Sequence, residues 1–212
     1  MGRRALPKID PTLDLSRHFR TLDDLPRPWN GAALFGRTAP LEIEVGSGKG
    51  LFLQNASLER PAHDFLGVEV AYKYARYTAA RLAKRGASNA IAVHGDGLRL
   101  FRELLPGDLL AAVHVYFPDP WWKARHHKRR VMTSAFLDDV VRTLQPGGRL
   151  HFWTDVKAYF DSTLELIARQ TPLDGPLDVP ERLPEHDLDF RTHFERRMRL
   201  HGEPVYRSLF VK

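Results

Sequence analysis

From Leu41 onward, short apolar runs alternate with longer amphipathic segments, and this alternation predicts the fold. The apolar runs expected to form strands are Leu41–Val45, Phe65–Val70, Ala90–Val93, Ala111–Phe117 and Arg149–Trp153. The segments with helical periodicity are Gly50–Leu58, Tyr72–Lys84, Val131–Leu144 and Val156–Arg169. Because strands that alternate with helices are joined by crossover connections, the pattern predicts an α/β fold with a mostly parallel sheet.

The two ends of the chain depart from this alternation. Residues 1–40 are rich in proline and polar residues, so we expect an amino-terminal arm with at most one short helix, followed by a main domain over residues 41–212. The proline-rich segment Thr171–Pro184 is expected to be a surface loop. Beyond it, Phe194–Leu200 and Val205–Val211 are expected to pair as an antiparallel hairpin at the edge of the sheet.

Composition narrows the class of protein. The 212 residues suffice for one large domain, or one domain with an appendage, and 43% hydrophobic with 27% charged residues is typical of a soluble globular protein. The absence of cysteine excludes disulfides and cysteine nucleophiles. No apolar run is long enough to form a membrane-spanning helix. Arg3 and Arg4 are not followed by the apolar segment of a signal peptide, so we expect a cytoplasmic protein.

A glycine-rich loop, Glu44–Gly50, follows the first expected strand and opens a helix. Gly46 and Gly48 let the backbone approach a ligand closely. A phosphate-binding Walker loop needs a serine or threonine in place of Gly50, and a dinucleotide loop needs its third glycine in place of Leu51. A carboxylate at Glu44 repels a pyrophosphate but attracts the ammonium and sulfonium groups of S-adenosylmethionine, which we therefore expect as the cofactor.

Two further carboxylates stand at the ends of later strands. Glu69 ends the second expected strand, at a spacing from the glycine loop that suits the binding of ribose hydroxyls. Asp96 follows the third, where it can accept a hydrogen bond from an adenine amino group. Because ligands bind outside the carboxyl ends of parallel strands, we expect Glu44, Glu69 and Asp96 to face one crevice.

The fourth expected strand runs into an aspartate that lies between two prolines. Pro118 and Pro120 fix the backbone on both sides of Asp119, so its carboxylate is expected to point rigidly into the crevice. Trp121 and Trp122 follow directly and are suited to stack on a base.

A cluster of cations comes next in the chain. Lys123–Arg130 holds five lysines and arginines and no acid, within a chain whose 32 basic and 26 acidic residues give a formal net charge of +6. A solvated surface normally mixes both signs of charge. We therefore expect Arg125, Lys128, Arg129 and Arg130 to bind the phosphate backbone of a nucleic acid.

Taken together, these motifs resemble the bacterial tRNA (guanine-N7-)-methyltransferases. The resemblance spans about Leu41 to Lys212 and is most specific in the stretch Phe117–Arg130, with further matches at Thr154-Asp155 and at Thr192–Glu195. It implies a Rossmann-like class I S-adenosylmethionine-dependent methyltransferase fold, with a mostly parallel sheet and an antiparallel last strand.

The resemblance also implies roles for individual residues. It places Glu44, Glu69 and Asp96 at the cofactor and Asp119 at both the cofactor and the reacting base. The residues that match substrate contacts of the family are Lys123, Asp155, Thr192, His193, Phe194 and Glu195. His193 departs from the family pattern, in which a lysine is common at this place, and Trp122 and Ala124 are also departures.

The chemistry that follows is methyl transfer to N7 of a guanine in tRNA, in the variable loop by resemblance. N7 carries a free lone pair, so the reaction needs alignment rather than a general base, and a fixed Asp119 carboxylate stabilises the positive charge that develops on the purine. We expect tRNA as partner and no metal, membrane or obligate protein partner. Two alternatives stay open: methylation of an exocyclic amine, and a non-catalytic RNA-binding module.

Overall fold

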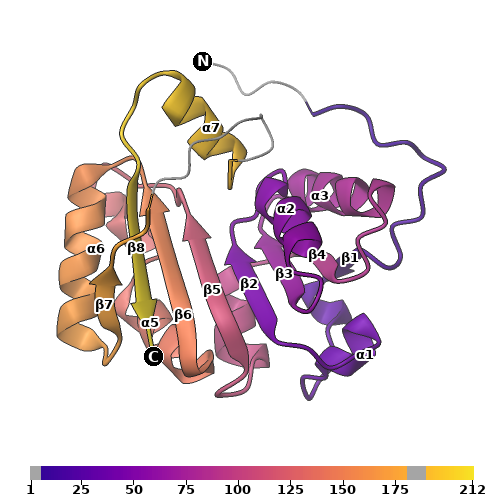
Figure 1. Ribbon diagram of the computed structural model, residues 1–212, viewed down its shortest axis with the longest axis horizontal. Helices are drawn as coiled ribbons and strands as arrows, with labels where there is room; N and C mark the ends of the chain where they lie inside the picture. The colour runs from indigo at the N-terminus through magenta and orange to yellow at the C-terminus, as the bar shows by residue number, and fades with distance from the viewer. Residues whose placement is uncertain (1–5, 181–189) are drawn as a thin grey trace.

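A single sheet of eight strands organises the chain in the computed structural model, which describes residues 6–180 and 190–212 apart from the side chains of residues 124, 127 and 128 (Figure 1). The strands lie in the spatial order β1-β4-β3-β2-β5-β6-β8-β7. Their bounds are Phe19–Thr21 for β1, Leu41–Val45 for β2, Asp64–Glu69 for β3, Ala90–His94 for β4, Leu110–Tyr116 for β5, Leu144–Thr154 for β6, Asp174–Leu177 for β7 and Tyr206–Val211 for β8.

Strand direction confirms the expected fold class. Strands β1 to β6 pair in parallel, whereas β8 pairs antiparallel with β6 and with β7. The chain builds the sheet outward in one direction through β2, β3 and β4, and in the other through β5 and β6. The carboxyl ends of β2 and β5 therefore form a topological switch point, the place where open α/β sheets bind ligands.

Helices cover both faces of the sheet. The longer ones are α2 (Leu51–Glu59), α3 (Tyr72–Lys84), α5 (Ser134–Thr143), α6 (Lys157–Gln170) and α7 (His193–Leu200), and the short helical turns are Leu22–Asp24, α1 (Gly31–Phe35), α4 (Gly97–Arg99), Leu100–Leu104 and Ala124–Arg129. Helices α2 and α3 enclose one core cluster, which includes Phe52, Phe65 and Leu82. Helices α5 and α6 enclose a larger cluster on the opposite face, around Ile43 and Phe136.

The expected hairpin at the carboxyl terminus is wrong in one of its two arms. The expected strand Val205–Val211 is found as β8 from Tyr206 onward, but Phe194–Leu200 belongs to helix α7. The helix begins at an N-cap, because the Thr192 hydroxyl accepts a hydrogen bond from the Glu195 amide at 3.0 Å. Strand β8 pairs instead with β7, which lies inside the segment Thr171–Pro184 that was expected to be a loop.

The segment of residues 1–40 also contributes to the sheet. Its strand β1 pairs in parallel with β4, with Phe19 opposite Ala92. Leu22 and Leu25 of the same segment are buried in the larger core cluster. The segment therefore contains a strand and buried core residues besides the expected short helix. The domain division at residue 40 stays a prediction.

Candidate active site

The carboxyl ends of β2 and β3 and the loops that follow β4 and β5 carry the acids singled out from the sequence. These strands are neighbours in the sheet, so their carboxyl ends form one continuous edge (Figure 1). Glu44 lies opposite Gly67 of β3 and His114 of β5 in the strand register. The Gly95 amide donates to the Glu69 carbonyl at 3.1 Å, which ties the loop that carries Asp96 to the end of β3.

The glycine loop is a tight turn that only glycine can form at its key positions. Gly46, Gly48 and Gly50 have φ values of +81°, +54° and +71°. A Cβ at Gly50 would lie 2.3 Å from the Thr78 side chain, so α3 packs directly on this backbone. A Cβ at Gly46 would meet nothing within 4 Å, so the backbone there faces open space.

Glu44 is the chemically unusual residue of the site. Its side chain is 3% exposed, and its Oε2 has no hydrogen-bond partner among the residues that the structure describes. Burial, with a further contribution from the charge of Glu69, raises the pKa of Glu44 well above its ordinary value. A buried carboxyl group with an unused acceptor suits a cationic ligand, so the residues present fit the ammonium or sulfonium group of S-adenosylmethionine.

Glu69 and Asp96 hold loop backbone at the same edge. The half-buried Glu69 accepts from the Gly48 amide at 2.9 Å through Oε2 and from the Ala71 amide at 2.8 Å through Oε1. The exposed Asp96 caps α4 by accepting from the Leu98 amide at 2.9 Å. The structure thus brings the three acids to successive strand ends, and Glu69 also fixes the glycine loop.

The loop after β5 is held in an unusual backbone conformation. Phe117 and Trp121, on either side of the Pro-Asp-Pro run, have φ values of +51° and +46°, a region that bulky residues rarely occupy. The half-buried Arg130 donates from Nε to the Pro120 carbonyl at 2.8 Å. Such conformations persist only where the surroundings enforce them, and here they present an exposed Asp119.

The basic cluster after this loop divides into two groups. Arg125 and Arg129 are exposed, as is Lys123 before them. Arg129 also lies over the Trp121 ring at 5.0 Å, while Trp122 is 71% exposed. Arg130 differs, because it lies over the Tyr159 ring at 4.6 Å and holds the loop backbone. The side chain of Lys128 lies outside the described residues.

Helix α7 lies above the ends of β2 and β5 (Figure 1). Its His193 ring nitrogen Nε2 lies 2.8 Å from Arg81 Nη1, and its Phe194 ring packs on Phe117 at 4.8 Å. Glu195 is 3% exposed and accepts from the Arg191 amide at 2.8 Å and from Arg207 at 3.3 Å. The carboxylate of Glu195 is therefore hydrogen-bonded within the protein. Asp155 is half-buried and directly follows β6.

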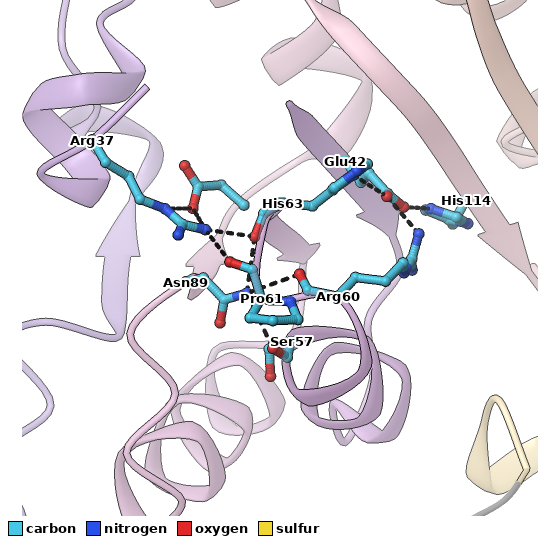
Figure 2. A network of polar contacts seen from close by, with 9 residues as sticks. Arg37, Glu42, Ser57, Arg60, Pro61, His63, Asn89 and His114 are labelled. Carbon is cyan, nitrogen blue, oxygen red and sulfur yellow. Dashed lines mark hydrogen bonds and ion pairs between the residues drawn. The ribbon is translucent and has the colours of Figure 1, made fainter. Parts of the chain in front are cut away.

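A buried polar network beneath α2 was not anticipated from the sequence. Glu42 accepts from His114 Nε2 at 2.7 Å and also binds His63 and Arg60 (Figure 2). Burial raises the pKa of Glu42, but His114 and Arg60 outweigh it and hold that pKa at about 2. His114 Nδ1 continues the network to the Tyr116 hydroxyl at 2.9 Å, at the end of β5. The signal available in the sequence was a glutamate alternating with apolar residues inside β2.

Two absences apply to residues 6–180 and 190–212. Among them, no group of three or more His, Cys, Asp or Glu residues is arranged to hold a metal ion. No helix in the same part of the chain combines the length and apolar character needed to span a bilayer.

Comparison with known proteins identifies methyltransferases as relatives of this chain. A family profile described as a putative methyltransferase matches residues 38–208. The chain is 52% identical to a tRNA (guanine-N(7)-)-methyltransferase of Rhodopirellula baltica, over 100% of this chain and 80% of that protein. It is 38% identical to the tRNA (guanine-N(7)-)-methyltransferase of Bordetella pertussis, over 88% of this chain and 73% of that protein.

Solved structures share the fold at low sequence identity. A 30S ribosomal A1408 methyltransferase from an uncultured bacterium superposes with a TM-score of 0.55 at 15% identity, covering 85% of this chain and 91% of that chain. The aminoglycoside resistance methyltransferase NpmB1 superposes with a TM-score of 0.53 at 20% identity, covering 84% of this chain and 89% of that chain.

Proposed function

The chain belongs to the tRNA (guanine-N7-)-methyltransferase family, and from this premise we propose that it methylates a guanine in the variable loop of tRNA. The reaction transfers the methyl group of S-adenosylmethionine to N7 of guanine. The main support for placing the reaction at this edge of the sheet is that the buried Oε2 of Glu44 has no partner among the described residues. We further propose a cytoplasmic location, where tRNA is available.

The residues proposed to bind the cofactor surround the glycine loop. S-adenosylmethionine supplies a methyl group activated by a positively charged sulfur. Glu44 attracts its cationic part, and the open backbone at Gly46 allows close approach. Glu69 holds Gly48 while each of its oxygens keeps a further lone pair for a ribose hydroxyl. Asp96, capping α4, is placed to bind the adenine amino group.

Asp119 is proposed as the catalytic residue, in contact with the guanine and near the methyl donor. Guanine N7 attacks with its own lone pair, so alignment is the main task and accounts for about 7–11 kcal/mol of the barrier in well-oriented systems. A positive charge develops on the purine during transfer. The carboxylate of Asp119 stabilises that charge without reorganising, because the Trp153 carbonyl, which accepts from the Phe117 amide, and Arg130 hold its loop.

The tRNA is proposed to lie across the β5 side of the crevice. Lys123, Arg125 and Arg129 are exposed next to the Asp119 loop and can bind phosphates. Lys128 and Arg130 complete the proposed contacts with the RNA backbone. The other proposed substrate contacts are Asp155, Thr192, His193, Phe194 and Glu195. A base inside a folded tRNA must be everted to reach the crevice.

One experiment tests this function. The protein is incubated with labelled S-adenosylmethionine and unmodified tRNA, and the labelled nucleoside is identified after digestion. We expect N7-methylguanosine, which carries a fixed positive charge, in contrast to a guanosine methylated on an amine. Chain cleavage at the modified base then maps its position, and a label outside the variable loop would refute the proposed target. A product other than N7-methylguanosine would refute the activity itself.

A further inference from the structure

Arg81 joins two parts of the site that are far apart in the chain. It lies on α3, and its Nη1 donates to the Lys49 carbonyl of the glycine loop at 2.7 Å. The same nitrogen lies 2.8 Å from Nε2 of His193, the first residue of α7. One guanidinium therefore contacts both the proposed cofactor loop and the helix that lies above the crevice.

The contact between Arg81 and His193 requires a neutral imidazole. His193 is exposed at its outer edge, but partial desolvation of the ring and the neighbouring positive charges of Arg81, Lys49 and Arg196 lower the pKa of His193 to about 4. At neutral pH the ring is uncharged, so Nε2 accepts a hydrogen bond from Arg81 while Nδ1 carries the proton. A lysine at this position would place a second cation beside the guanidinium and repel it.

The next residue of α7 contacts the other side of the crevice. The Phe194 ring packs on Phe117, the first residue of the strained loop that presents Asp119, with 4.8 Å between ring centroids. The first turn of α7 therefore contacts both sides of the proposed site, with His193 on the glycine-loop side and Phe194 on the Asp119 side.

We propose that Arg81 and His193 are positioning residues that couple the two binding events, so that cofactor and tRNA bind with positive cooperativity through α7. This inference rests on the proposed function, since it requires both ligands to bind at the crevice. It gives His193 a role in holding the helix, in addition to the substrate contact implied by the family pattern. Cofactor binding fixes the glycine loop, and Arg81 transmits that order to the helix under which the base enters.

The test measures coupling rather than turnover. The dissociation constant of S-adenosylhomocysteine, which cannot donate a methyl group, is measured by calorimetry with and without saturating unmodified tRNA. In the wild-type protein we expect tRNA to tighten this binding by about 5-fold or more, the usual range of allosteric coupling. His193→Ala should bring the ratio close to one, and His193→Gln, which restores a neutral acceptor, should recover most of it.

Matched variants separate coupling from a general structural effect. Arg81→Ala should abolish coupling as His193→Ala does, and it should also weaken S-adenosylhomocysteine binding alone, because the Lys49 carbonyl loses its donor. Lys84→Ala removes an exposed cation three residues further along the chain and should keep the wild-type ratio. A wild-type ratio of one, or an unchanged ratio in both Arg81→Ala and His193→Ala, would overturn the proposal. Failure of the wild-type protein to form N7-methylguanosine would instead overturn the proposed function.

Discussion

Replacement of Glu44 by glutamine gives the sharpest test of the cofactor site. The carboxyl group is buried, and its Oε2 has no partner among the described residues. A hydrogen bond to a charged group contributes about 1.5–3 kcal/mol, which corresponds to about 10- to 150-fold in a dissociation constant. We therefore expect Glu44→Gln to weaken S-adenosylmethionine binding by that factor while leaving the fold intact, since glutamine has nearly the same shape.

The raised pKa of Glu44 makes cofactor binding depend on protons. In the free protein burial keeps the proton on the carboxyl group above its ordinary pKa of 4.5, whereas a bound cation favours the carboxylate. Cofactor binding should therefore release a proton, and the affinity should rise as pH increases from 4.5 toward the raised pKa. Calorimetry in two buffers of different ionisation enthalpy measures this release, and Glu44→Gln should abolish it.

Glu44 should also lower the stability of the protein when no ligand is bound. Above pH 4.5 the unfolded chain loses the Glu44 proton while the folded protein keeps it, so stability falls as pH rises until the folded pKa is reached. The decrease is about 1.4 kcal/mol for each pH unit in this window. Glu44→Gln lacks this decrease and should melt at a higher temperature, by about 2–4 °C for each kcal/mol.

These measurements share one control and one refuting result. Glu59→Gln removes a surface carboxylate at the end of α2 and should leave affinity, proton release and melting temperature unchanged. If Glu44→Gln bound the cofactor as tightly as the wild-type protein and released the same number of protons, the assignment of the cationic subsite to Glu44 would be wrong.

Three further predictions concern the rest of the site. Asp119→Asn should lower kcat by about 10²–10³ with a nearly unchanged KM for tRNA, measured by steady-state methyl transfer; a rate within a few-fold of wild type would remove its catalytic role. Replacement of Arg125 and Arg129 by glutamate should reduce the slope of log K against log salt for tRNA binding by about 0.7–0.9 for each lost phosphate contact, and an unchanged slope would place the RNA elsewhere. Glu42→Gln should lower the free energy of unfolding, measured in urea, by about 3–5 kcal/mol at pH 7. Because the pKa of Glu42 is about 2, the stabilisation from its carboxylate is lost as pH falls from 4.5 to 2. The difference in unfolding free energy between the wild-type protein and Glu42→Gln should therefore disappear in acid.

Periodicity was sufficient for the parallel part of the sheet. The expected strands match β2 to β5 to within one residue, and helices at the expected places bury one face against them. The expected Arg149–Trp153 is only the later part of β6, which begins at Leu144. The acids at the strand ends were predictable for a related reason, since a parallel sheet brings its carboxyl ends to one edge whatever the details of the loops.

The carboxyl-terminal segment shows where periodicity is ambiguous. Phe194 and Met198 are four residues apart, a spacing that fits one face of a strand and one face of a helix equally well. The deciding signal was local, because Thr192 followed three residues later by Glu195 is the pattern of a helix N-terminus. Strand β7 gave no such signal, since all of its residues are exposed and its pairing with β8 is decided by tertiary structure.

The left-handed residues beside Asp119 had no detectable signal in the sequence. Phenylalanine and tryptophan disfavour positive φ, so Phe117 and Trp121 adopt it only because the Trp153 carbonyl, Arg130 and the packing of α7 hold the loop. Two prolines predict a rigid loop, but the direction in which it points depends on contacts with distant parts of the chain.

The contrast between two glutamates on one strand supports the proposal that a ligand binds at the edge where Glu44 lies. Glu42 and Glu44 are two residues apart on β2, point to the same face of the sheet and are 2% and 3% exposed. Glu42 binds Arg60, His63 and His114 (Figure 2), so this fold can supply partners to a buried carboxylate on β2. At Glu44, two residues nearer the switch point, the described residues offer Oε2 none and Glu69 adds a like charge. An acid left in this state lowers the stability of the free protein, and a cationic ligand at the same edge offsets that loss when it binds.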